Sequence, residues 1–118
     1  MKNILSGLCC AGLLAGFGSV ASAATMTMTG VVSDSMCGAS HAKMMARHKD
    51  AKMTDRDCTT GCVKAGAKYV FVSDGKVYQI ANQNQPDLVK EAGDQVSLTG
   101  NVNGDTLTVS KVAMAKRN

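Results

Sequence analysis

The sequence predicts a mainly β domain with a helical insertion, in the order strand, two helices, two strands, helix, two strands. Three observations predict this class. Several short runs alternate polar and apolar residues and are rich in Val and Thr, which is typical of half-buried strands. Asp-Gly and Asn-Gly pairs stand between such runs and indicate tight hairpins. Residues 34–66, between the first two runs, instead space their Cys, His and Met residues as a helix does.

The first strand is expected at the N-terminal end of the domain, and the second and third strands are expected directly after the insertion. Thr25 to Ser33 (TMTMTGVVS) is the first strand, with Gly30 at a bulge or bend. Residues 68–73 and 76–81 flank Asp74-Gly75, a pair that favours a two-residue hairpin turn.

The remaining elements follow a single proline. Residues 86–93 have Pro at a first helical position and Gly at the end, which predicts a short helix. Residues 95–102 and 106–113 form a second hairpin around Asn103-Gly104. Five strands with a helix between the third and fourth are the order of a five-stranded OB-like barrel. An open, sandwich-like sheet stays an alternative, because the sequence does not give the pairing of the first strand.

The N-terminal segment is predicted to be a signal peptide covering residues 1–23. Lys2 gives a positive start, residues 4–17 are mostly apolar but too short to span a bilayer, and Ala21-Ser22-Ala23 fits signal peptidase. Cleavage after Ala23 leaves residues 24–118 as one exported domain, periplasmic or secreted, with no membrane segment. Its expected partners are a metal ion or an envelope protein, and the oligomeric state stays open.

Composition narrows the possible functions. The chain has 118 residues and a net charge of +4, which suits one small domain and lacks the strong positive charge of a nucleic-acid binder. Two Tyr, two Phe and no Trp are too few for a base-stacking surface. Glu91 is the only glutamate, and no nucleophile elbow or phosphate-binding glycine loop occurs. We therefore expect a binding protein that is not an enzyme and does not bind nucleic acid.

The cysteine count is odd once the signal peptide is removed. Cys9 and Cys10 belong to that segment, so the exported domain keeps Cys37, Cys58 and Cys62. An oxidising compartment favours disulfides, and three cysteines leave one thiol without a partner.

The insertion is predicted to contain two helices that carry these cysteines. The first, over residues 37–49, has one face composed of potential soft-metal ligands: Cys37, His41, Met44, Met45 and His48. The second begins after Thr54 as N-cap, with Asp55 and Asp57 in its first turn, and ends near Gly66. It places Cys58 and Cys62 one turn apart on the same face.

One interpretation of this pattern is a metal site. Cys37, His41, Cys58 and Cys62 form two ligand pairs on two helices, which suits a four-coordinate zinc ion. Copper(I) is the other candidate, because it binds Cys, His and Met. Met26 and Met28 on the first strand would contribute if they lay near the insertion.

The alternative interpretation is a disulfide between Cys37 and either Cys58 or Cys62. The bridge would join the two helices, and the protein would then be an envelope module that binds a small ligand or another protein and no metal. Closing a loop of this length stabilises a domain by about 3 kcal/mol. A third interpretation, a reactive thiol at Cys58 near a helix start, is opposed by the charges of Asp55 and Asp57.

The motifs also resemble those of a family of small exported bacterial proteins of unknown function. The matching segments are GVVSDSMCGASH at residues 30–41, DCTTGCV at 57–63 and GAKYV at 66–70. The resemblance continues through residues 75–78 and the last hairpin. It implies that Cys37, His41, Cys58 and Cys62 belong to one constellation, and it implies no particular activity.

Overall fold

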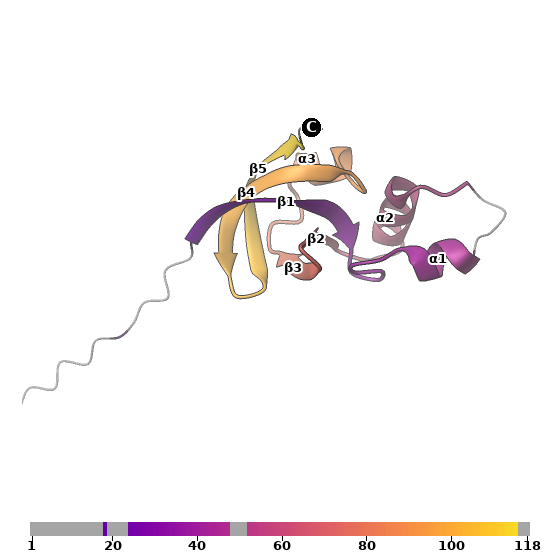
Figure 1. The fold of residues 1–118 in the computed structure, drawn as a ribbon, viewed down its shortest axis with the longest axis horizontal. Coiled ribbons are helices and arrows are strands. Elements are labelled where there is room, and N and C mark those ends of the chain that lie inside the picture. The colour runs from indigo at the N-terminus through magenta and orange to yellow at the C-terminus, as the bar shows by residue number, and fades with distance from the viewer. Residues whose placement is uncertain (1–17, 19–23, 48–51, 116–118) are drawn as a thin grey trace, which may run out of the picture.

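The protein is mainly β, and its five strands form one mixed sheet that closes into a ring (Figure 1). The computed structural model describes residue 18 and residues 24–47 and 52–115, so the predicted signal peptide lies almost entirely outside the described residues. The strands are β1 (Ala24–Asp34), β2 (Tyr69–Ser73), β3 (Lys76–Ile80), β4 (Gln95–Asn103) and β5 (Thr106–Met114), and the helices are α1 (Ala42–Arg47), α2 (Asp55–Lys64) and α3 (Pro86–Lys90). The predicted order of elements is confirmed.

Strand β1 closes the ring by pairing with two different strands. Its first part, Ala24 to Val31, runs antiparallel to β4, and its last part, Val31 to Asp34, runs antiparallel to β2. A short parallel pairing of β3 with β5 completes the circuit β1-β2-β3-β5-β4. The closed ring excludes the open sheet that the sequence left possible.

Gly30 stands where β1 passes from one partner strand to the other, as the predicted bend requires. A Cβ atom on Gly30 would lie 2.2 Å from the carbonyl oxygen of Val72 and 2.7 Å from the ring of Phe71. Only glycine allows this approach of β1 to β2.

The first hairpin has the predicted turn, and the second hairpin turn is shifted by one residue. Asp74 and Gly75 both have positive φ, 50° and 76°, as a type I′ turn requires. The second turn is Gly104-Asp105, one residue later than expected, with φ of 60° at Gly104.

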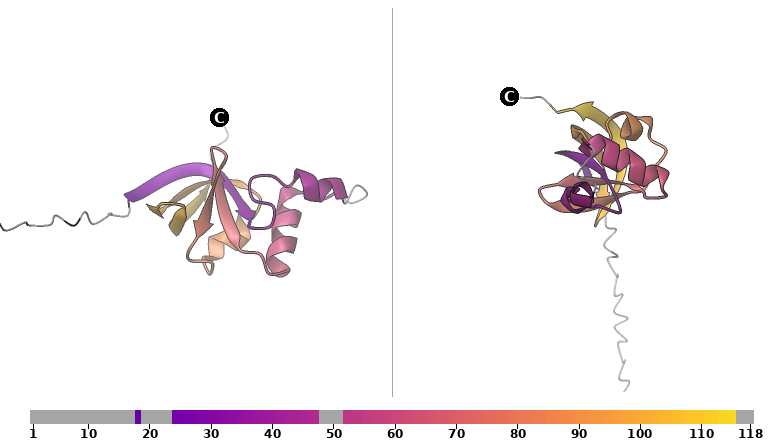
Figure 2. Two further views of the ribbon diagram at one scale, coloured as in Figure 1. Left: turned by 90° about the horizontal axis from the view of Figure 1, so that it is seen from below. Right: turned by 90° about the vertical axis from the view of Figure 1, so that its right-hand side faces the viewer.

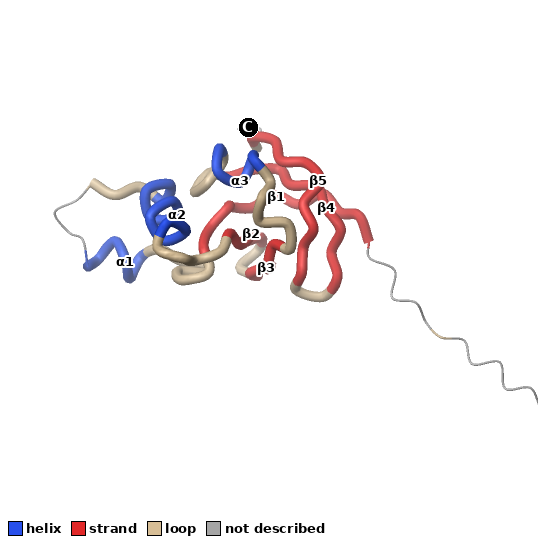
Figure 3. The backbone as a smooth tube through the Cα atoms, turned by 180° about the vertical axis from the view of Figure 1, so that it is seen from behind, coloured by secondary structure: helices blue, strands red, loops and turns tan. Residues whose placement is uncertain are grey.

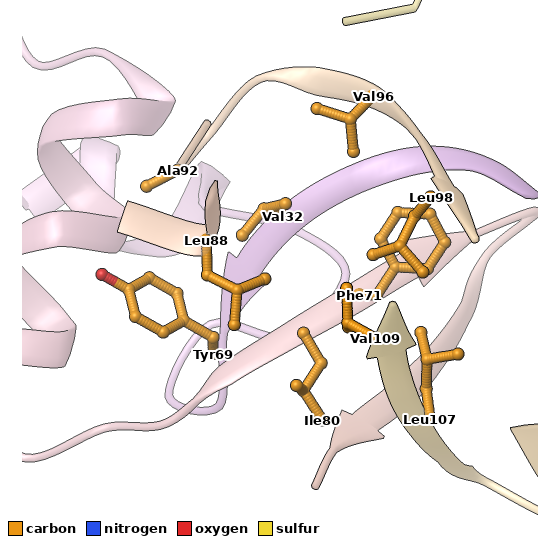
Figure 4. Close-up of a cluster of buried hydrophobic side chains, with 10 residues drawn as sticks. All are labelled: Val32, Tyr69, Phe71, Ile80, Leu88, Ala92, Val96, Leu98, Leu107 and Val109. Carbon is orange, nitrogen blue, oxygen red and sulfur yellow. The ribbon is translucent and has the colours of Figure 1, made fainter. Parts of the chain in front are cut away.

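The hydrophobic core fills the ring and is closed at one end by α3 (Figure 4). Phe71, Leu98 and Leu107 are fully buried between the strands, and Leu88 from α3 is also fully buried. Burying one such side chain contributes about 1.5–3 kcal/mol. The core therefore fixes the frame on which the insertion stands.

The insertion extends beyond the end of β1, where α2 packs against β1 and α1 lies farther out (Figures 1 and 2). Figure 3 shows α1 and α2 at the opposite end of the molecule from the turn between β4 and β5, and α3 beside the strands. Helix α1 begins at Ala42, so the predicted helix over residues 37–49 was wrong at its start. No helix in the described part of the chain is long and apolar enough to cross a membrane.

Candidate metal centre

Cys37 lies in a turn that the Asp34 carboxylate shapes. Oδ1 of Asp34 accepts hydrogen bonds from the backbone N–H groups of Met36 at 3.0 Å and Cys37 at 2.9 Å. Gly38 continues the turn with φ of 60° and donates its N–H to the Asp34 carbonyl at 2.8 Å. These bonds offer the backbone an alternative to helix, which explains why α1 starts only after His41.

Helix α2 supplies the other two cysteines. Thr54 and Asp57 form a capping box at its start, in agreement with the predicted N-cap. Cys58 and Cys62 lie one turn apart and are buried, at 3% and 7% exposure. The helix ends at Ala65 as C-cap, followed by Gly66 with φ of 110°.

The three cysteine sulfur atoms meet between the turn and α2; we call this group the cysteine trio. All three sulfurs lie within 4.8 Å of one another. The Sγ atoms of Cys37 and Cys58 are 4.0 Å apart, whereas a disulfide requires about 2.05 Å. Cys37, Cys58 and Cys62 are therefore free thiols here, with Cys37 the only one of them that is partly exposed.

His41 lies next to the cysteine trio and is 7% exposed. Its Nδ1 atom is 3.0 Å from Oδ1 of Asp55, and its Nε2 atom is 3.1 Å from Oδ2 of the fully buried Asp34. The hydroxyl oxygens of Ser33 and Thr59 lie 3.2 and 3.3 Å from Nε2. Both ring nitrogens thus have fixed oxygen neighbours.

The structure divides the predicted ligands between two groups. The cysteine trio is one, and Asp34, Cys37 and His41 form a second, whose ligand atoms also lie within 4.8 Å of one another. Cys37 belongs to both. His41 is thus grouped with Cys37 and Asp34 and not with Cys58 and Cys62.

Four methionines and His48 are the remaining ligand candidates from the sequence. The side chains of Met44 and Met45, and all of His48, lie outside the described residues. Met26 and Met28 line a pocket of about 590 Å³ together with Lys76 and Tyr78 of β3. The expectation that they would lie near the insertion is not supported by this placement.

The thiols are held in their protonated form in the metal-free protein. Burial and the charge of Asp34 raise the pKa of Cys37 and of Cys62 to about 11. The pKa of Cys58 is raised too, mainly by burial. A bound cation would reverse these shifts, because it stabilises thiolate directly. The raised pKa values also argue against Cys58 as a reactive nucleophile.

Sequence reasoning missed Asp34 and assigned Asp55 only to the helix start. The sequence does contain a signal for Asp34. An Asp at the end of a strand often accepts hydrogen bonds from the backbone N–H groups two and three residues later, which is an Asx turn. The contact of Asp55 with His41 had no local signal, since it depends on how α2 packs against the turn.

A pocket of about 280 Å³ opens beside His41 and gives this side of the centre access to solvent. Ser33, Ser40 and Asp55 are among its lining residues.

No known protein family, curated protein or solved structure matches this chain. Membership in a family of small exported bacterial proteins therefore stays a prediction.

Proposed function

We propose that this protein binds a soft metal ion, zinc or copper, through Cys37, Cys58 and Cys62, in a structural or metal-handling role. One observation carries the proposal. Three free thiols from two separate segments converge, with all sulfur atoms within 4.8 Å of one another and two of them buried. Thiolate is the preferred ligand of these ions.

The spacing of the sulfur atoms supports a common ion. Sulfur ligands at about 2.3 Å from a zinc ion lie about 3.8 Å apart in a tetrahedron and about 4.0 Å apart in a trigonal plane. The Sγ atoms of Cys37 and Cys58 are 4.0 Å apart. This separation equals the trigonal value, and the other sulfur pairs lie within 4.8 Å.

His41 is the fourth ligand that the sequence predicts. Its Nε2 atom lies in the group that contains Cys37, and Asp55 accepts from Nδ1 on the opposite side of the ring. Such a carboxylate partner is the usual arrangement for a metal-bound histidine, because it fixes the ring and raises its basicity.

The second candidate function is a disulfide-stapled envelope module that binds a small ligand or a protein and no metal. The 4.0 Å contact between Cys37 and Cys58 names the pair that would form the bridge. Cys62 would then keep the single remaining thiol.

Mass spectrometry of protein purified from the exported fraction separates these functions. We expect native spectra to show bound metal, and denatured protein to have lost it and to contain three free thiols. The absence of metal, with two hydrogens missing and one free thiol, would instead establish the disulfide. Melting supplies an independent test: chelator and Cys58→Ser should each lower the melting temperature, whereas reductant alone should not.

We also propose that the ring is an OB-type barrel and that the protein is exported after cleavage following Ala23. The ring order β1-β2-β3-β5-β4, with α3 between β3 and β4, supports the first. The n-region, apolar stretch and Ala-Ser-Ala site support the second. In this proposal the protein binds its ligand and catalyses no reaction.

A further inference from the structure

The two groups of potential ligands share a single atom, the Cys37 sulfur. Cys58 and Cys62 approach it from α2, and Asp34 and His41 approach it from the end of β1 and the turn that follows. A thiolate has several lone pairs and can bind two cations at once. The partly exposed Cys37 therefore lies between two sets of ligands.

We propose that this centre holds two divalent ions of the zinc type, bridged by the thiolate of Cys37. Cys58 and Cys62 are the remaining protein ligands of the first ion, and Asp34 and His41 bind the second. His41 thus serves the second ion here, whereas in a single-ion centre it would be the fourth ligand of the first. The inference rests on the proposed function, because it requires that the cysteine trio binds metal, and it adds a second site.

Asp34 and His41 are oriented as ligands by contacts on their far sides. Oδ1 of Asp34 accepts two backbone N–H groups, so Oδ2 is left toward His41. Nδ1 of His41 faces the Asp55 carboxylate and Nε2 faces the Asp34 carboxylate, so the two carboxylates fix the orientation of the ring. An ion bound here would take the place of the contacts that Nε2 makes with the hydroxyl groups of Ser33 and Thr59.

The short distance between Nε2 of His41 and Oδ2 of Asp34 requires a proton or a cation between the two atoms. Two lone-pair acceptors 3.1 Å apart repel each other unless a proton or a cation lies between them. Ligands at about 2.1 Å from one ion are about 3.0 to 3.4 Å apart for bond angles between 90° and the tetrahedral value. The observed separation fits an ion in place of the proton.

The charge of the cluster favours two divalent ions over one. Cys37, Cys58 and Cys62 as thiolates and Asp34 as carboxylate carry four negative charges, and Asp34, Cys58 and Cys62 are buried. Two divalent ions balance this charge. One divalent ion held by the cysteine trio leaves the buried carboxylate of Asp34 without a metal partner, with the His41 ring as the group that would balance it.

The experiment is an anaerobic titration of the reduced, metal-free protein with Cd²⁺, with bound ions counted by native mass spectrometry. We expect two ions per chain. Asp34→Asn should bind one ion and keep the thiolate-to-cadmium absorption, because the amide oxygen retains the turn while the second ligand set loses its charge. The matched control is Asp105→Asn, an exposed residue at the second hairpin that should still bind two ions.

Three further variants test the bridge and guard against misfolding. Cys37→Ser should weaken both ions, whereas Cys62→Ser should weaken the first alone, and His41→Gln should repeat the result of Asp34→Asn if the latter fails to fold. Saturation of the parent at one ion per chain would overturn the inference while leaving the proposed function intact. Two ions bound equally well by parent, Asp34→Asn and His41→Gln would also overturn it. No cadmium absorption at all would defeat the proposed function itself.

Discussion

Gly93 lies directly against the backbone of Arg56 at the start of α2. A Cβ atom on Gly93 would be 2.3 Å from the Arg56 amide nitrogen, and Gly93 has φ of 78°. The Gly93 N–H also donates to the Val32 carbonyl at 2.8 Å, and the Arg56 guanidinium donates to the Lys90 carbonyl at 2.8 Å. The turn after α3 thus docks α2, and with it two cysteines, onto β1.

Replacing Gly93 with alanine should therefore affect both stability and metal binding. We expect Gly93→Ala to lower the free energy of unfolding by about 1–3 kcal/mol, because α2 must move away from the ring. Cd²⁺ affinity should fall with it. The control is Gly104→Ala, which also has positive φ but no neighbouring atom within 4 Å of the new Cβ. Equal losses in the two variants would show that the contact with Arg56 is unimportant.

The capping box of α2 should stabilise the whole domain. Thr54→Ala removes the side chain that accepts the Asp57 N–H, and we expect it to cost about 1 kcal/mol in urea unfolding. Thr60→Ala, in the interior of the same helix, should cost nothing or stabilise slightly, because alanine has the higher helix propensity. A larger loss for Thr60→Ala than for Thr54→Ala would contradict the capping role.

Alkaline pH should destabilise the reduced, metal-free protein through its cysteines. The folded pKa of Cys37 and Cys62 is about 11, against an ordinary value of 9.0. Their contribution is therefore fully present below pH 9.0 and is lost as the pH rises toward about 11. Urea midpoints measured between these pH values should fall more steeply for the parent than for a variant in which Ser replaces both residues. Parallel curves would rule out this effect.

Asp55 should act on metal binding only through His41. Asp55→Asn leaves the ligand atoms in place but weakens the contact with Nδ1, so we expect about a tenfold loss in affinity for the second Cd²⁺ ion. The first ion should bind as in the parent. Asp87→Asn, in the first turn of α3, is the matched control for losing an acidic residue at a helix start. A comparable loss for both ions would mean that Asp55→Asn perturbs α2 as a whole.

Much of the fold could be predicted because its signals are local. Asp74-Gly75 produced a hairpin turn, Thr54 capped α2, and Gly30 marked the bend in β1. Ring closure was expected from the order of the elements, but the pairing of β1 with both β2 and β4 could not be predicted, since it depends on contacts between distant segments. The alternation of polar and apolar residues in β1 does not indicate where pairing with β4 ends and pairing with β2 begins.

The candidate site was predicted less completely than the fold. The sequence singled out three cysteines that the structure brings together, but it placed Cys37 and His41 on one helix, whereas both precede α1. The Asp34 side chain competes with helix formation there by bonding to the next N–H groups. The helical spacing of apolar and ligand residues does not show that a carboxylate such as that of Asp34 will bind the backbone and delay the start of the helix. His41 therefore came to face Asp34 in place of Cys58 and Cys62.

The division of β1 between two partner strands also sets an order of assembly during synthesis. Its last residues pair with β2, which follows directly after the insertion, so the strand end bearing Asp34 finds its partner as soon as the first hairpin has been made. Its earlier residues must wait for β4, near the C-terminal end of the chain. The donor atoms of the centre all precede β2 along the chain. The ligand set is therefore complete along the chain before β4, whereas the turn at Gly93 that docks α2 onto β1 comes later in the sequence than these ligands.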